Sequence, residues 1–119
     1  MVMTLESVSH ICRRAEWDAA LPNGCYLGSS QDAADGFLHL STAAQIAASA
    51  AKHRAGQDGL LLIEADPGAM GAALRWERPR GGELFPHLYG PLPLTAVRRV
   101  AALPLGPDAR HIFPWGPGE

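Results

Sequence analysis

Apolar and polar residues alternate in several short segments of the chain, and this spacing predicts β-strands. The predicted strands are residues 7–12, 36–40, 59–65, 74–78, 85–89 and 97–103. The segment 59–65, with the sequence GLLLIEA, is apolar almost throughout, so we expect it to be buried on both faces. Side chains two residues apart on a strand point to the same face, so two polar side chains at this spacing can contact the same ligand.

Two segments have helical periodicity instead. Residues 13–21 carry apolar side chains at helical spacing, which predicts a short helix. A second helix is predicted from Thr42-Ala43-Ala44-Gln45, which resembles a capping box, through an alanine-rich stretch to a stop at Gly56. Because strands outnumber helices and the helices come early, the pattern predicts the α+β class.

The remaining segments carry turn-forming residues. Residues 25–34 are predicted to be a loop, and residues 79–82 a flexible break between strands. From residue 104 onward the chain is rich in Pro and Gly, which predicts an extended or loosely ordered C-terminal arm. We therefore expect a single domain over residues 1–119, with its core in about 7–103.

Composition narrows the classes of partner. The chain has 119 residues, of which 47% are hydrophobic, as expected for a folded domain. Its net charge of −2 gives no general attraction to polyanions, so no nucleic-acid partner is expected. No apolar run could span a bilayer and the first residues lack the pattern of a signal peptide, so we expect a cytoplasmic protein without a membrane partner. Cys12 and Cys25 are expected to be reduced thiols.

The sequence DGFLHLST at residues 35–42 is the first candidate site. On a strand His39 and Ser41 would share one face, with Leu38 and Leu40 turned into the core. The strand leads into a helix N-terminus, whose free N–H groups suit phosphate or ribose oxygens. The alternative is that His39 is a hydrogen-bonded core residue and the hydroxyls only cap the helix, which is how we interpret Thr42.

The sequence FPHLYGPL at residues 85–92 is the second candidate site. His87 and Tyr89 would share a face and could stack on a flat ring. Pro86 and Pro91 cannot donate to a sheet ladder, so we predict an edge strand or lip here. The alternative is that Phe85 and Tyr89 belong to the core while His87 faces solvent.

Two carboxylates lie close to this segment in sequence, Glu83 and Glu77. Either could orient a sugar hydroxyl or stabilise a developing cation, although an exposed glutamate with no such role is the commoner case. The sequence leaves the choice between them open.

A third histidine, His10, lies on the first predicted strand two residues before Cys12. We expect His10, His39 and His87 to converge on one concave surface. Three imidazoles and a water could also bind zinc, but no short ligand spacing supports this, so a metal-free site is expected. A nucleophilic Cys12 is a weaker interpretation, because His10 on the same strand is poorly placed to act as its base.

These motifs, together with His10-Ile11, Trp17, Gly24, Tyr26 and Gln45, resemble an uncharacterised bacterial family, domain-of-unknown-function family 952. The resemblance covers nearly the whole chain, to about residue 103. That family is grouped with the ADP-ribosyltransferase-like superfamily. The resemblance implies two small, mostly antiparallel sheets around an NAD-sized cleft, with one or two helices.

The resemblance also implies roles for individual residues. His10 matches the first-strand residue that holds a ribose of NAD, and His39-Leu40-Ser41 resembles the His-x-Ser motif of the tRNA 2′-phosphotransferase relatives. The glutamate that stabilises the oxocarbenium-like state in active members has no direct match here. His87 stands near its position, and Glu83 is the offset candidate.

Two hypotheses follow. The first is an NAD-using ADP-ribosyltransferase or glycohydrolase, with His39, Glu83 and His87 as catalytic residues and His10, Ser41 and Tyr89 as binding residues. NAD would then be a substrate, and no tightly bound cofactor is expected. The second is a module that binds a nucleotide or another small molecule without turning it over. Under either hypothesis we expect a monomer or a weak homodimer.

Overall fold

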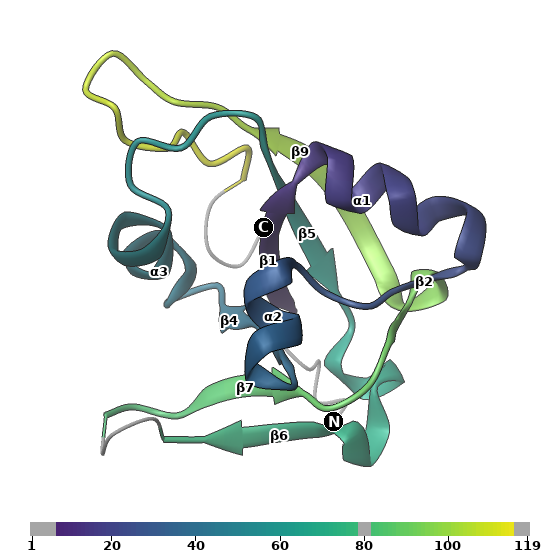
Figure 1. The fold of residues 1–119 in the computed structure, drawn as a ribbon. Coiled ribbons are helices and arrows are strands. Elements are labelled where there is room, and N and C mark those ends of the chain that lie inside the picture. The colour runs from purple at the N-terminus through teal and green to yellow at the C-terminus, as the bar shows by residue number, and fades with distance from the viewer. Residues whose placement is uncertain (1–6, 79–81, 116–119) are drawn as a thin grey trace.

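The computed structural model describes residues 7–78 and 82–115, and these residues are built around a four-stranded antiparallel sheet (Figure 1). The strand order is β4-β1-β5-β9. The strands are β1 (Val8–Arg13), β4 (Ser41–Thr42), β5 (Leu60–Ala65) and β9 (Val97–Leu103). Every residue of β5 is buried, as the apolar run predicted, because β5 lies between β1 and β9 and is covered on both faces.

Two smaller antiparallel sheets complete the β structure. One has the order β3-β7-β6 and the other pairs β2 with β8. These strands are β2 (Cys25–Tyr26), β3 (Leu38–His39), β6 (Leu74–Glu77), β7 (Phe85–Leu88) and β8 (Leu92–Pro93). The predicted α+β class is thus confirmed, with antiparallel sheets and few helices, but the described residues form three sheets and three α-helices instead of the two sheets and one or two helices that the resemblance implies.

The helices are short. They are α1 (Arg14–Ala20), α2 (Ser30–Asp35) and α3 (Ile46–His53), with 3₁₀ turns at Leu21–Asn23, Pro67–Ala69, Gly71–Ala73 and Leu94–Ala96. None of the helices in the described ranges has the length and apolar character needed to cross a membrane.

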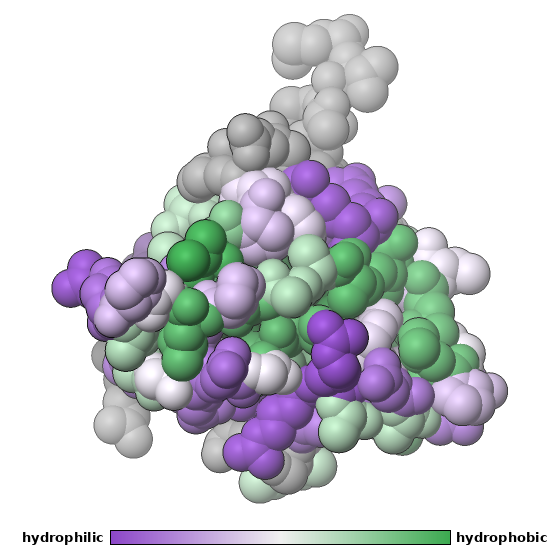
Figure 2. Space-filling model, turned by 90° about the horizontal axis from the view of Figure 1, so that it is seen from above, coloured by the Kyte–Doolittle hydropathy of each residue, from purple (hydrophilic) through white to green (hydrophobic). Residues whose placement is uncertain are grey.

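The four-stranded sheet separates two hydrophobic cores. On one face Val8 and Cys12 pack with α1, Tyr26 and the buried leucines of β3, β7 and β8. On the other face α3 and the C-terminal segment cover Ile11 and alternate residues of β5. Figure 2, seen from above, shows hydrophobic residues as an interrupted band among hydrophilic ones. Alternate side chains of β1 and β5 therefore point into two different hydrophobic cores.

The segment predicted to be a loop, residues 25–34, contains β2 and all of α2 except its last residue. This prediction was wrong because the two elements are short and have little apolar periodicity. The Ser29 side chain accepts a hydrogen bond from Asp32 N–H, and the Asp32 side chain accepts one from Ser29 N–H, so α2 begins with a capping box. This Ser-x-x-Asp pattern was the available sequence signal.

The predicted strand 36–40 and the residues after it divide between two sheets. Leu38 and Leu40 are buried as predicted. However, His39 ends β3 in the three-stranded sheet, whereas Ser41 begins β4 in the four-stranded sheet. His39 is 43% exposed and Ser41 is 6% exposed, so the prediction that they share a face was wrong. A change of sheet between neighbouring residues breaks the two-residue alternation.

The helix after β4 starts later than predicted, at Ile46 instead of Thr42. The Gln45 side chain accepts a hydrogen bond from Thr42 N–H (3.0 Å) and donates one to the Leu84 carbonyl (2.7 Å). Gln45 thus joins the start of α3 to the segment that precedes β7.

The prediction of an edge strand at 85–89 was also wrong, because β7 lies between β3 and β6. The Pro86 carbonyl accepts a hydrogen bond from Leu40 N–H (3.1 Å). Because the N–H and C=O of a strand residue point to the same side, the N–H that Pro86 lacks would also have faced Leu40, which lies just beyond the end of β3. The missing donor therefore breaks no pairing with β3 or β6, and a central position is possible.

Residues 104–115 fold back onto the sheet. Leu105 pairs with His111, whose Nε2 contacts the Gln57 carbonyl at 2.8 Å. Phe113 and Trp115 pack against the core beneath α3. Residues 79–81 of the predicted break and 116–119 of the predicted arm lie outside the described residues.

Candidate functional site

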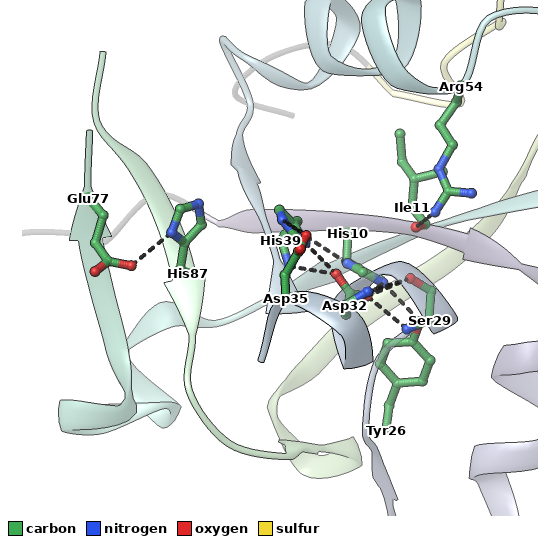
Figure 3. Close-up of polar contacts among 10 residues, drawn as sticks. All are labelled: His10, Ile11, Tyr26, Ser29, Asp32, Asp35, His39, Arg54, Glu77 and His87. Carbon is green, nitrogen blue, oxygen red and sulfur yellow. Dashed lines mark hydrogen bonds and ion pairs between the residues drawn. The ribbon is translucent and has the colours of Figure 1, made fainter. Parts of the chain in front are cut away.

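The centre of the candidate site is the carboxylate of Asp32 on α2, which is 3% exposed (Figure 3). Its Oδ2 accepts hydrogen bonds from the backbone N–H (2.7 Å) and hydroxyl (2.8 Å) of Ser29. Its Oδ1 accepts from the backbone N–H (3.0 Å) and the ring Nδ1 (2.6 Å) of His39. One buried side chain thereby ties the start of α2 to the end of β3.

The local backbone makes room for this carboxylate. Gly28 has a φ of +103°, which L side chains rarely adopt, and a Cβ added there would lie 2.8 Å from Asp32 Cβ. Gly36 has a φ of +85° and ends α2, so the chain can turn directly into β3.

Opposing effects set the pKa of Asp32. Burial by itself would raise the pKa, but the hydrogen bonds from the His39 ring and from the backbone N–H groups of His39 and Ser29 lower it. The net result is a pKa well below the ordinary value for aspartate, so Asp32 is ionised at neutral pH.

His10 lies beneath this carboxylate with both ring nitrogens engaged. Nδ1 lies 2.7 Å from the His39 carbonyl oxygen, so it must carry the proton and donate. Nε2 lies 2.9 Å from the Tyr26 hydroxyl and 3.5 Å from Asp32 Oδ2. Burial, the largest effect, lowers the pKa of His10, so the neutral ring accepts a hydrogen bond from Tyr26.

His39 lies between two carboxylates at the surface. Nδ1 donates to Asp32, and Nε2 lies 3.1 Å from Asp35 Oδ2. His39 thus lies between one buried and one exposed aspartate.

His87 forms a second carboxylate–imidazole pair across the sheet. Glu77 Oε1 accepts from His87 Nδ1 at 2.8 Å and from the Tyr89 hydroxyl at 2.7 Å. The hydrogen bond from Tyr89, followed by that from His87, lowers the pKa of Glu77, so its carboxylate is ionised. Unlike Asp32, the Glu77 side chain is 38% exposed.

Flat rings connect the two pairs. His39 and His87 are cross-strand partners with ring centroids 5.7 Å apart. Phe37 stacks on His87 at 4.2 Å and also contacts His39 (4.6 Å) and Tyr89 (5.1 Å). The Arg75 guanidinium lies over the Tyr89 ring at 4.8 Å. We call the four rings of Phe37, His39, His87 and Tyr89 the ring cluster.

The structure brings four of the predicted site residues together, and these are His10, His39, His87 and Tyr89. His10 bonds to the backbone of His39 and His39 adjoins His87, but His10 is 3% and His87 7% exposed, so the three do not line one open surface as expected. Ser41 is not among them, since it is buried and its hydroxyl donates to Ser49 Oγ at 3.0 Å. Glu83 is exposed and lies outside the network around Glu77.

Sequence reasoning missed the role of Asp32 and the position of Phe37. Asp32 fell in the predicted loop, and only its capping-box spacing to Ser29 could have indicated it. Phe37 was part of the first motif, but nothing local predicts its stacking on His87, which is 50 residues away in sequence.

The three histidines do not form a metal site. Both nitrogens of His10 are engaged by protein atoms. Within residues 7–78 and 82–115, no group of three or more His, Cys, Asp or Glu side chains is arranged to hold a metal ion. The three-histidine zinc alternative thus finds no support in the arrangement of these side chains.

The fold and the site define a small α+β domain in which three histidines and two carboxylates form a largely buried polar cluster. Residues 11–100 match the family described as "Protein of unknown function (DUF952)", and the chain belongs to that family. The chain is similar to protein CC0527 from Caulobacter crescentus, in an X-ray structure with 44% identity and a TM-score of 0.84 that covers 89% of this chain and 93% of that chain. The solution NMR structure of CC0527 gives 45% identity and a TM-score of 0.78 with 91% of each chain covered. No curated protein matches the chain.

Proposed function

We propose that this protein has an ADP-ribosyltransferase-like fold and cleaves NAD, transferring ADP-ribose to water or to another acceptor. The observation that carries the proposal is the ionised, exposed Glu77 carboxylate beside the ring cluster. Two unpaired thiols, Cys12 and Cys25, are consistent with the reducing cytoplasm, where NAD is available.

The chemistry requires a fixed negative charge near the ribose. The bond from ribose C1′ to nicotinamide breaks and its electron pair moves to the pyridinium nitrogen, leaving positive charge on the ribose. Water then bonds to C1′ and releases a proton, giving ADP-ribose and nicotinamide. A preorganised carboxylate such as Glu77 stabilises that cation, because His87 and Tyr89 hold it in place before the reaction.

The ring cluster suits the flat groups of the substrate. Nicotinamide can stack on exposed aromatic edges at this surface, and the Arg75 guanidinium supplies positive charge for the pyrophosphate. His87 donates from Nδ1 to Glu77, so in its neutral form the lone pair is on Nε2. We assign to this nitrogen the proton lost by the attacking water.

The test is release of nicotinamide from NAD, with and without added acceptors. We expect Glu77→Gln to lower the rate by a factor of about 100 or more, because an amide cannot stabilise the cation as a carboxylate does. Asp18→Asn is the matched control, because Asp18 is an exposed carboxylate on α1, far in sequence from the cluster. His39→Ala is also expected to abolish release.

Other variants and outcomes separate the alternatives. Glu83→Gln decides between the two glutamates: a large loss there, with Glu77→Gln active, would support Glu83, the candidate that the family resemblance implies. If NAD raises the melting temperature but no nicotinamide is released, the protein is a binding module. If NAD neither binds nor reacts, the resemblance concerns the fold alone.

A further inference from the structure

The outer edge of β6 is open. β6 pairs with β7 on one side, and among residues 7–78 and 82–115 no strand pairs with its other side. An open edge presents unpaired N–H and C=O groups that can bond to another strand. The outer edge of β6 is therefore a candidate interface.

The hydrogen-bond pattern shows which residue presents its backbone groups there. The Ala73 carbonyl accepts from Tyr89 N–H at 2.8 Å, so alternate residues from Ala73, including Arg75 and Glu77, direct their backbone groups toward β7. Trp76 lies between these residues, so its N–H and C=O face the open edge.

The side chains of this edge are complementary to themselves. We propose that two copies of the chain pair through β6 in antiparallel register, centred on Trp76. In this register the two Trp76 residues exchange backbone hydrogen bonds. Arg75 then lies opposite the partner's Glu77, and Glu77 opposite the partner's Arg75. Directly opposed residues of opposite charge stabilise an antiparallel pair.

Exposure of Trp76 supports the same register. The Trp76 side chain is 47% exposed, on the face of β6 opposite to Arg75 and Glu77. Centred pairing places the two indoles side by side, which removes apolar surface from water. The partner strand would thus cover one of the large hydrophobic side chains that the monomer leaves exposed.

The other long edge strand lacks this complementarity. β9 ends the four-stranded sheet and carries Arg98 and Arg99 in succession, with no acidic residue within the strand. Antiparallel self-pairing of β9 would bring no opposite charges together. The preference for β6 therefore comes from its own sequence and not from being an edge.

Pairing through β6 would also alter the candidate site. His87 and Tyr89 both bond to Oε1 of Glu77, so the partner's Arg75 can approach Oε2 in the dimer, whereas the monomer leaves this oxygen to a ligand. Each site would then contain a residue from the other copy. The proposal does not depend on NAD cleavage, because association is measured without substrate.

The test combines two charge reversals. Arg75→Glu leaves only negative charges at positions 75 and 77, and Glu77→Arg leaves only positive ones. Each variant alone is expected to dimerise at least about tenfold more weakly than the wild type, because like charges face each other in both symmetric pairs. An equimolar mixture is expected to form heterodimers, since every opposed pair then has opposite sign.

Sedimentation equilibrium over a concentration series measures these affinities, and circular dichroism checks that each variant is folded. Arg110→Glu is the control, as an exposed charge reversal away from β6 that should leave association unchanged. A wild-type protein that stays monomeric at millimolar concentration would overturn the proposal. So would a mixture that associates no better than its separate components.

Discussion

The site contains two carboxylate–imidazole pairs that differ in their surroundings. Asp32 is buried beneath the surface and accepts four hydrogen bonds, two from Ser29 and two from His39. Glu77 is exposed and accepts bonds from His87 and Tyr89 at a single oxygen. Both carboxylates have a lowered pKa, but only Glu77 can be reached from solvent.

This difference in burial gives the two carboxylates different roles. A buried carboxylate with four donors cannot also bind a substrate, so Asp32 fixes the position of His39. An exposed carboxylate held at one oxygen keeps its other oxygen available, so Glu77 can contact a ligand. Similar pairs of residue types thus serve different purposes according to burial.

The largest expected effect is on Asp32. Asp32→Asn replaces a carboxylate oxygen by an NH₂ group, which cannot accept the donors that remain on Ser29 and His39. We expect the free energy of unfolding to fall by about 3 kcal/mol, measured by urea denaturation. Ser29→Ala, which removes only the cap hydroxyl, should cost about 1 kcal/mol. An Asp32→Asn protein as stable as the wild type would show that Asp32 does not have the structural role that distinguishes it from Glu77.

Gly28→Ala tests the same pair through the backbone. The new Cβ would lie 2.8 Å from Asp32 Cβ, at a φ of +103°. We expect a loss of about 2 kcal/mol in the free energy of unfolding. Gly24→Ala is the comparison, since Gly24 also has a positive φ but nothing lies within 4 Å of its Cβ position. Equal losses at both glycines would show that the crowding of Asp32 contributes nothing.

Acid should destabilise the buried part of the site in two steps, first through His10 and then through Asp32. The pKa of His10 is lowered in the folded state, so its contribution is complete above about pH 6.5 and declines as the pH falls toward the folded value. The pKa of Asp32 is also lowered, so its contribution is complete above about pH 4 and declines below that. We expect the free energy of unfolding to decrease as the pH is lowered from 7 to 5.

The variant His10→Gln should remove most of the slope between pH 7 and 5. His53 is the control: burial, followed by the charge of Lys52, lowers its pKa, but its side chain is exposed to solvent. His53→Gln should therefore change the slope less. A slope that survives in His10→Gln would assign the acid sensitivity to another group.

The smallest expected effect is on the exposed pair. Tyr89→Phe removes the hydroxyl that donates to Glu77, and we expect the pKa of Glu77 to rise toward its ordinary value while stability changes little. An NMR titration of the Glu77 side chain measures the shift. If the pKa does not move, His87 alone holds the carboxylate, and Tyr89 only contributes its ring.

Sequence alone determined the parts of the protein that depend on local pattern. The apolar run predicted β5, because a strand buried on both faces must be apolar along its length, and the alternation of apolar and polar residues predicted β1 and β9. The alternation in the second motif correctly placed His87 and Tyr89 on one face, since both reach Glu77. The local spacing also offered Glu77 as one of two candidate carboxylates.

Tertiary structure decided which segments became neighbours. Sequence pattern does not reveal that the chain changes sheet between His39 and Ser41, or that β7 is central, because strand order depends on contacts between distant segments. The choice of Glu77 over Glu83 as the partner of His87 follows from the register of β6 against β7. Asp32 became the centre of the site for the same reason. Its partners are brought to it by a helix cap and a strand end, and residue spacing alone could not show that they meet around a buried charge.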